Sequence, residues 1–165
     1  MIKKVKQTKL EKILVIFLII LSFISFGSYL LIKDKCLFVK DYDPQKLNFE
    51  DPKNIVILNT ICGNVIIELY PKLSPNSVKR FKMLIKNNEY DNVAFHRVIK
   101  DVLVQTGDLE FGKKENLNYA KIGTGKSGYG KINSELEQKF DFSRGSIAFA
   151  RTEEINSEDS QFFIL

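Results

Sequence analysis

One histidine is the natural starting point for a search for chemistry, because imidazole titrates near neutral pH. His96 is the only histidine in the 165-residue sequence. A Ser-His-Asp or Cys-His site also needs a nucleophile, and the sequence has no G-x-S-x-G motif. His, Cys and carboxylate residues do not cluster at metal-ligand spacing. We therefore expect His96, which lies within an apolar run, to be a packed side chain, and we expect no metal and no other cofactor.

A glycine-rich run, residues 123–130 (GTGKSGYG), contains the pattern G-x-G-x-x-G. A nucleotide-binding loop of this kind must follow a strand and open a helix, so that phosphate meets the helix N-terminus. Residues 116–122 make a poor strand, and residues 131–133 make a poor helix start. We expect a tight surface loop whose glycines permit positive φ, rather than a nucleotide site.

Three short segments carry basic, amide and aromatic side chains in a fixed order. They are Phe95–Ile99 (FHRVI), Gln105–Asp108 (QTGD) and Ser160–Ile164 (SQFFI). With the GTG of the glycine-rich run and Gly145–Arg151 (GSIAFAR), they resemble the cyclophilins. The spacing between the last two motifs resembles the bacterial form, and residues 54–84 follow the family's first hairpin and helix. The resemblance covers residues 54–165.

The resemblance implies a peptidyl-prolyl cis-trans isomerase, which rotates the peptide bond before proline. The barrier is about 18–20 kcal/mol, because rotation breaks amide resonance. In the twisted amide the proline nitrogen regains a lone pair, so a fixed cation that donates a hydrogen bond to it stabilises the transition state selectively. By the family's pattern that cation is Arg97, whose charge is permanent and whose donors form a rigid fork.

Other residues are assigned to substrate binding by the same resemblance. Gln105 would hold the substrate backbone, Phe163 would form the aromatic floor of the proline pocket, and Gln161 would lie beside the groove. Ala150 and Arg151 match the edge that bonds the substrate main chain. Val102 stands in place of an aromatic residue and Leu103 in place of a methionine, so we expect a wider and shallower pocket. The implied partners are proline-containing polypeptides.

The elements that would position these residues are short. Apolar runs predict strands, and a serine followed by proline at Ser74–Pro75 predicts a helix start with Ser74 as N-cap. In that helix Val78, Phe81, Leu84 and Ile85 form an apolar stripe, while Lys79, Arg80, Lys82 and Lys86 are expected to face water. The strand runs are 54–59, 65–69, 94–99, 102–105, 146–150 and 161–165. This pattern predicts a mainly β fold, a cyclophilin-like antiparallel barrel with a capping helix.

The N-terminal region predicts a membrane attachment. Residues 13–32 contain no charge and are long enough to span the hydrocarbon core. Five lysines lie in residues 1–12, which predicts a cytoplasmic basic tail and a single-pass topology with the domain outside the cytoplasm. We expect an uncleaved signal anchor, with a cleaved signal peptide as the alternative, followed by a linker over residues 33–53.

The charge distribution argues against nucleic acid as a partner. Residues 1–35 carry seven lysines and two acidic residues, which accounts for the whole net charge of +5. The remaining 130 residues have no net charge, whereas a sequence-independent nucleic-acid binder needs a cation surplus. The two cysteines, Cys36 and Cys62, allow either one disulfide or two free thiols.

The C-terminal end of the sequence adds alternatives to the enzyme. Cyclophilins continue past the SQFFI motif, so the resemblance predicts that residues 54–165 are an incomplete domain that lacks its last strands. Besides an isomerase that assists the folding of extracytoplasmic proteins, the sequence allows a peptide-binding module without turnover, or a truncated remnant.

Overall fold

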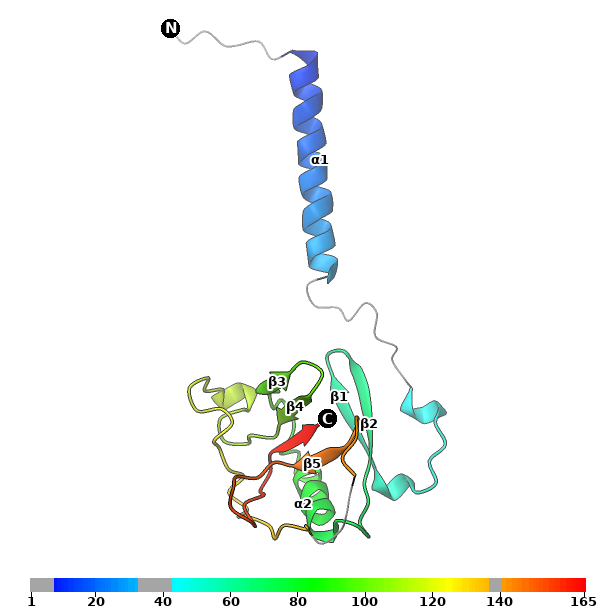
Figure 1. The fold of residues 1–165 in the computed structure, drawn as a ribbon. Helices are drawn as coiled ribbons and strands as arrows, with labels where there is room; N and C mark the ends of the chain where they lie inside the picture. Colours follow the sequence, from blue (N-terminus) through cyan, green and yellow to red (C-terminus); the bar gives the residue numbers. More distant parts are fainter. Residues whose placement is uncertain (1–7, 33–42, 137–140) are drawn as a thin grey trace. The chain divides into compact units, whose positions relative to one another are not determined.

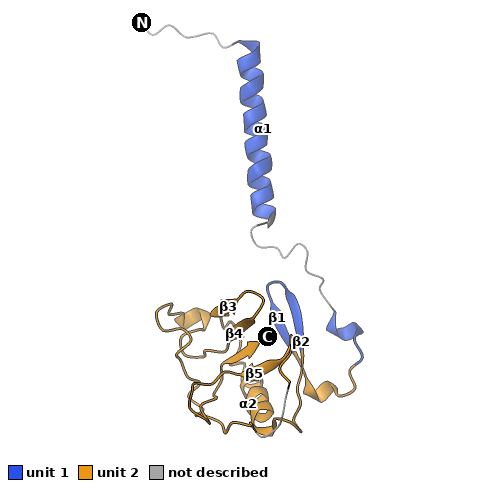
Figure 2. Ribbon diagram, in the orientation of Figure 1, with its two compact units in different colours: residues 1–48, 57–66 blue, residues 49–56, 67–165 orange. Residues whose placement is uncertain are grey.

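The computed structural model describes residues 8–32, 43–136 and 141–165. The chain divides into two compact units (Figure 2). The first unit contains residues 1–48 and 57–66, and the second contains residues 49–56 and 67–165. All of the candidate site residues lie in the second unit, so its geometry decides what the chain can do chemically.

The N-terminal helix α1 spans Lys9–Ile32 (Figure 1). Its 24 residues correspond to a length of about 36 Å. The helix begins before the predicted span because Thr8 and Glu11 form a capping box, in which the Thr8 N–H donates to Glu11 Oε2 at 2.8 Å and the Glu11 N–H donates to Thr8 Oγ1 at 3.3 Å. By length and composition α1 is able to cross a membrane, and a signal sequence has the same properties.

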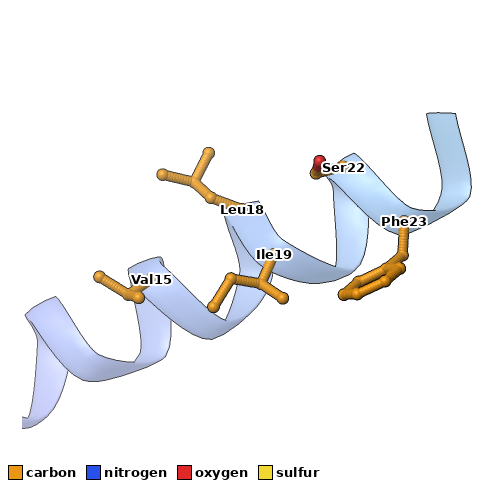
Figure 3. Close-up of a pocket in the computed structure, with 5 residues that line it drawn as sticks. All are labelled: Val15, Leu18, Ile19, Ser22 and Phe23. Carbon is orange, nitrogen blue, oxygen red and sulfur yellow. The ribbon is translucent and has the colours of Figure 1, made fainter. Parts of the chain in front are cut away.

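A shallow hollow lies on one face of α1. Figure 3 shows its lining, which is Val15, Leu18, Ile19, Ser22 and Phe23. These residues recur at helical spacing, so the hollow is a furrow between neighbouring side chains of one exposed helix. The Ser22 hydroxyl is the single polar side-chain group in it, and the furrow therefore offers no constellation for chemistry.

The hairpin predicted from the two β-branched runs is present as β1 (Ile55–Thr60) and β2 (Gly63–Glu68). Its turn is closed by the Thr60 hydroxyl, which donates to the Gly63 oxygen at 2.9 Å and accepts from the Cys62 N–H at 3.1 Å. Cys62 is disulfide-bonded, so the alternative of a free thiol is wrong for this residue. Cys36 lies outside the described residues.

Two 3-10 turns precede the hairpin, η1 (Pro44–Lys46) and η2 (Pro52–Asn54). In both, an aspartate accepts a hydrogen bond from a backbone N–H two residues on, which is the usual role of Asp before proline. The predicted linker over residues 33–53 is thus partly structured from residue 43, and its residues 33–42 lie outside the described part of the chain.

The second unit contains an antiparallel sheet of four short strands. They are β3 (Arg97–Ile99), β4 (Leu103–Thr106), β5 (Ile147–Phe149) and β6 (Phe162–Ile164), in the order β3-β4-β6-β5. Four of the predicted strand runs, 94–99, 102–105, 146–150 and 161–165, each overlap one of these strands. The run 94–99 is strand only in its last three residues, because the Ala94 N–H donates to the Gly112 oxygen instead of joining the ladder. A further 3-10 turn, η3, spans Lys114–Asn116.

Helix α2 (Pro75–Lys86) packs on one face of this sheet through Phe81, whose ring contacts those of Phe149 and Phe162. Its apolar stripe is confirmed at Val78, Phe81 and Leu84, which are buried, while Ile85 is half-buried. The Phe81 ring lies edge-on to the ring of Phe162 at 5.1 Å between centroids. Tyr90 packs against the same two rings and donates its hydroxyl to the Ser160 oxygen at 2.8 Å, and this burial raises the pKa of Tyr90 above its ordinary value.

Arg80 does not face water as its place in the helical pattern predicts. Its side chain is only 11% exposed and forms an ion pair with Asp159 at 3.0 Å. The same guanidinium donates to the oxygens of Gly130 and Tyr129 at 2.7 and 3.2 Å. An arginine can be buried in this way because a carboxylate and backbone carbonyls accept hydrogen bonds from both of its terminal nitrogens. Helical periodicity does not reveal partners 49 to 79 residues away.

The N-terminus of α2 is capped from a distance. Ser74 occupies the N-cap position, as predicted, but its side chain makes no capping hydrogen bond. Instead Glu135 Oε1 accepts the Asn76 N–H at 2.7 Å, and Glu135 Oε2 accepts the Ser77 N–H at 3.1 Å and its hydroxyl at 2.8 Å. A carboxylate there also meets the positive end of the helix dipole.

We expect replacement of Glu135 by alanine to lower the free energy of unfolding by about 1 kcal/mol, because the first-turn donors lose their acceptor. Ser74→Ala is the matched control and should change stability by no more than about 0.5 kcal/mol. Urea unfolding of the two variants measures both values. A larger loss for Ser74→Ala than for Glu135→Ala would contradict this account of the cap.

Candidate active site

The register of the sheet assembles the central candidates on one face. Arg97 lies opposite Gln105, and Gln105 lies opposite Phe163. Directly opposed residues of antiparallel strands project to the same side, so the three side chains form a row across β3, β4 and β6. Phe162, which alternates with Phe163, projects to the other face and is 3% exposed in the aromatic core. One face of the sheet thus packs on α2 and the other carries the candidate chemistry.

Arg97 and Gln105 are joined directly. Arg97 Nη1 donates to Gln105 Oε1 at 3.3 Å. The arginine side chain is exposed, whereas Gln105 is half-buried. Gln105 therefore holds an otherwise mobile guanidinium at the rim of the face, with donors of the fork left to point outward.

Gln161 lies on the other side of Gln105 and ties the row to the glycine-rich run. Gln105 Nε2 donates to Gln161 Oε1 at 3.1 Å. Gln161 Nε2 donates to two backbone oxygens, those of Gly123 at 3.1 Å and Gly125 at 3.0 Å. The run is therefore more than a surface loop. Gly125 is buried, and Gly123 has the positive φ of 95° that the glycines of the run were expected to permit.

The Asp108 side chain binds the backbone of the same glycine-rich run. It is fully buried, and its two oxygens accept four backbone N–H bonds. Oδ1 accepts from Glu110 at 3.1 Å and Phe111 at 2.8 Å, and Oδ2 accepts from Gly123 at 2.6 Å and Gly125 at 3.0 Å. Charge-assisted bonds of this number offset the cost of removing a carboxylate from water.

His96 is packed, as expected, but its surroundings are unusual. Both ring nitrogens are buried, and neither has a hydrogen-bond partner among the described residues. A Cβ added at Gly123 would lie 3.3 Å from its ring, so the loop rests on the imidazole. Burial lowers the pKa of His96 below its ordinary value, and the Arg97 charge adds to this effect. The Asp108 charge, the Ala94 backbone and the Gln161 side chain act in the opposite direction, although neither of the last two meets the geometric criteria for a hydrogen bond to the ring. His96 is therefore expected to be neutral at neutral pH.

This lowered pKa predicts an acid-sensitive fold. The unfolded chain takes up a proton at His96 more readily than the folded chain, so the stabilisation is present above the unfolded pKa of about 6.5 and is lost as pH falls towards the folded pKa. The urea concentration at the unfolding midpoint should decrease as the pH is lowered from about 7.5 to about 5.5. In His96→Gln the fall should be much smaller, and an equal fall in both proteins would assign the effect elsewhere.

The remaining candidates are brought less closely together. The Ala150 N–H already donates to the Gln161 oxygen at 2.7 Å, so it is engaged within the protein. The Arg151 guanidinium bonds the oxygens of Thr152 and Glu153 in its own loop and does not reach the row. Leu103 is half-buried two residues before Gln105, on the same face. Val102 lies in the β3–β4 turn and is 53% exposed.

Two contributors to this site are given no role by the sequence analysis. Asp108 and the oxygens of Gly123 and Gly125 are parts of quoted motifs, but backbone acceptors carry no signal in a sequence. A signal for Asp108 does exist, because it is an acid between Gly107 and Leu109, shortly after an apolar strand. An acid in such a place must find donors in the fold.

Comparison with known proteins identifies the family of the second unit. Residues 55–165 match the family model described as cyclophilin type peptidyl-prolyl cis-trans isomerase/CLD. A protein of Brucella suis named as a probable peptidyl-prolyl cis-trans isomerase is 41% identical over 122 residues, which cover 73% of this chain. The chain spans 62% of the length of that relative.

Two solved structures show the same fold. A cyclophilin type peptidyl-prolyl cis-trans isomerase of Cryptosporidium parvum, crystallised in the presence of the dipeptide Ala-Pro, is 32% identical with a TM-score of 0.50, covering 62% of this chain and 61% of its own. Cyclophilin AquaCyp293 of Hirschia baltica is 22% identical with a TM-score of 0.55, covering 76% of this chain and 64% of its own. The matched residues, which contain the whole of the Arg97 row, place this chain in the cyclophilin-type peptidyl-prolyl cis-trans isomerase family.

Proposed function

We propose that the chain catalyses cis-trans rotation of X-Pro peptide bonds, with Arg97 as the catalytic residue. The observation that carries the proposal is the row on the sheet face, in which Arg97 is bonded to Gln105 at 3.3 Å and Phe163 follows in register. The row offers a cation, an amide and an aromatic ring side by side. These are the groups that recognition of a twisted prolyl amide requires.

The chemistry follows from amide resonance. A planar amide nitrogen has little basicity, and rotation restores its lone pair. An outward donor of Arg97 would then bond this nitrogen more strongly in the twisted state than in either planar state, which lowers the barrier. No bond to the enzyme forms, and no proton needs to leave Arg97.

The substrate would be held along the same face. Phe163 would take the proline ring, with Val102 and Leu103 as apolar neighbours, and the Gln105 amide would hold the substrate backbone near the rotating bond. Gln161 and the backbone at Ala150 and Arg151 would border the groove. Because the Ala150 N–H is engaged with Gln161, substrate main chain would use the other backbone groups of this edge.

We further propose that α1 anchors the domain outside the cytoplasm, where its substrates would be polypeptides that are still folding. Five lysines on the N-terminal side of the span support this orientation. The sheet and the hairpin would belong to an antiparallel barrel of the family type. Protease added to intact spheroplasts tests the orientation: the domain should be digested, and a protected domain would contradict it.

The activity is tested with the full chain in detergent and a short Ala-Pro peptide. Without catalyst, isomerisation takes tens to hundreds of seconds at 25 °C. Catalytic amounts of the chain should accelerate it in proportion to protein concentration. Saturable binding of the peptide without acceleration would replace the enzyme with the second candidate, a peptide-binding module, which the exposure of Val102 at the proposed proline pocket favours.

A further inference from the structure

The polar groups behind Arg97 form one continuous chain that ends on buried backbone. It runs from Arg97 through the amides of Gln105 and Gln161 to the oxygens of Gly123 and Gly125. All of its hydrogen bonds lie between 3.0 and 3.3 Å. These hydrogen bonds link four segments, which are β3, β4, the residue before β6 and the glycine-rich run.

The direction of this chain is fixed at its buried end. A carboxamide has one donating and one accepting end, whereas a backbone oxygen can only accept. The side-chain amide of Gln161 meets the Gly123 and Gly125 carbonyl oxygens on one side, so its NH₂ group must lie on that side. Its oxygen must then face Gln105. Gln105 must then turn its own NH₂ group to Gln161 and its oxygen to Arg97. The orientation of both amides follows from the position of two loop oxygens.

Those oxygens are held by Asp108. Its Oδ2 accepts the N–H groups of both Gly123 and Gly125. The packing is so close that a Cβ at Gly125 would overlap the carboxylate and lie 2.8 Å from its Cγ. In contrast, a Cβ at Gly128, in the same loop, would meet nothing within 4 Å.

We propose that Asp108 is a positioning residue for the isomerase reaction, which fixes the loop oxygens and, through Gln161 and Gln105, the guanidinium of Arg97. Asp108 is fully buried, so its role in the proposal is to position other groups and not to contact substrate. The inference rests on the proposed function for its kinetic consequence. Its structural consequence, the order of the Arg97 side chain, can be measured whether or not the chain is active.

The test compares two substitutions in the same loop of the full chain. Gly125→Ala forces the loop off Asp108, whereas Gly128→Ala adds a methyl group in open space, at the cost of its positive φ of 80°. We expect Gly125→Ala to lower kcat by about 10- to 100-fold, since small displacements of catalytic groups have effects of this size. KM should change less than kcat, and Gly128→Ala should stay within about twofold of the unsubstituted chain in kcat.

The second readout is the ¹⁵N–¹H signal of the Arg97 side chain. In the unsubstituted chain and in Gly128→Ala it should be resolved and shifted from that of a free arginine. In Gly125→Ala and Asp108→Asn it should move towards the free value. A folded Gly125→Ala chain with full kcat, or one whose Arg97 signal is unchanged, would overturn the inference. Failure of every chain to accelerate isomerisation, with the Arg97 signal still lost in Gly125→Ala, would overturn the proposed function alone.

Gln161→Glu decides the question if neither of those two variants folds. Its ionised carboxylate cannot donate to the two loop oxygens, but its protonated form can donate to one. His96 neighbours Gln161 and titrates over a similar pH range, so each value is compared with that of the unsubstituted chain at the same pH. Relative to that chain, activity and the Arg97 signal should recover as pH falls from about 8 to about 5, as the new carboxyl group becomes protonated. If the Arg97 signal does not recover, the inference that Gln161 and Gln105 position Arg97 is wrong.

Discussion

Replacing Arg97 with alanine is expected to reduce kcat/KM for an Ala-Pro peptide by on the order of 10²–10³, the usual effect of removing one donor aimed at developing charge or a lone pair. The fold should be unaffected, because the side chain is exposed and, within the described part of the chain, donates one hydrogen bond, to Gln105. We expect the free energy of unfolding to change by no more than about 0.5 kcal/mol.

Two controls sharpen this result. Arg97→Lys keeps the positive charge but loses the forked guanidinium, so it cannot hold Gln105 and donate outward in the same geometry. Its activity should lie between that of the unsubstituted chain and that of Arg97→Ala. Arg144→Ala removes an exposed arginine outside the site and should leave the rate unchanged. Equal losses in the Arg97 and Arg144 variants would show that the effect is one of net charge.

Two adjacent phenylalanines should give opposite results. Phe162→Ala removes a ring that is 3% exposed and lies 5.1 and 5.3 Å from the rings of Phe81 and Tyr90. We expect it to lower the free energy of unfolding by about 3–5 kcal/mol, a large part of the stability of a small domain. Thermal or urea unfolding of the purified variant measures the loss.

Phe163→Ala should instead spare the fold and weaken the site. Its ring is half-buried on the opposite face, in register with Gln105. Its loss should cost about 1 kcal/mol of stability and should weaken peptide binding about tenfold, or ~1.4 kcal/mol. A Phe163→Ala protein that is as unstable as Phe162→Ala, with unchanged peptide affinity, would contradict the assignment of faces.

Local pattern predicts much of this fold, because its elements are set by short-range rules. The stripe of Val78, Phe81 and Leu84 predicts α2, and the β-branched runs predict the hairpin within two residues. Resemblance of short motifs then selects Arg97, Gln105 and Phe163, and the register of the sheet brings these three together.

What the sequence does not predict depends on partners far along the chain. Glu135 caps a helix 58 and 59 residues away, and Arg80 is buried only because Asp159 and two carbonyls meet it. Asp108 finds its donors partly in a loop 15 and 17 residues on. Periodicity assigns such charged residues to solvent, since it counts neighbours on one element and not the donors that another element supplies.

The most direct test of the central claim is two-dimensional exchange NMR of an Ala-Pro peptide with catalytic amounts of the full chain. Exchange peaks between the cis and trans signals appear only when isomerisation becomes fast relative to the uncatalysed tens to hundreds of seconds. The account predicts such peaks for the unsubstituted chain and for Arg144→Ala, and none for Arg97→Ala at the same bound fraction of peptide. Exchange peaks of equal strength with Arg97→Ala, or none with the unsubstituted chain although it binds the peptide, would contradict it.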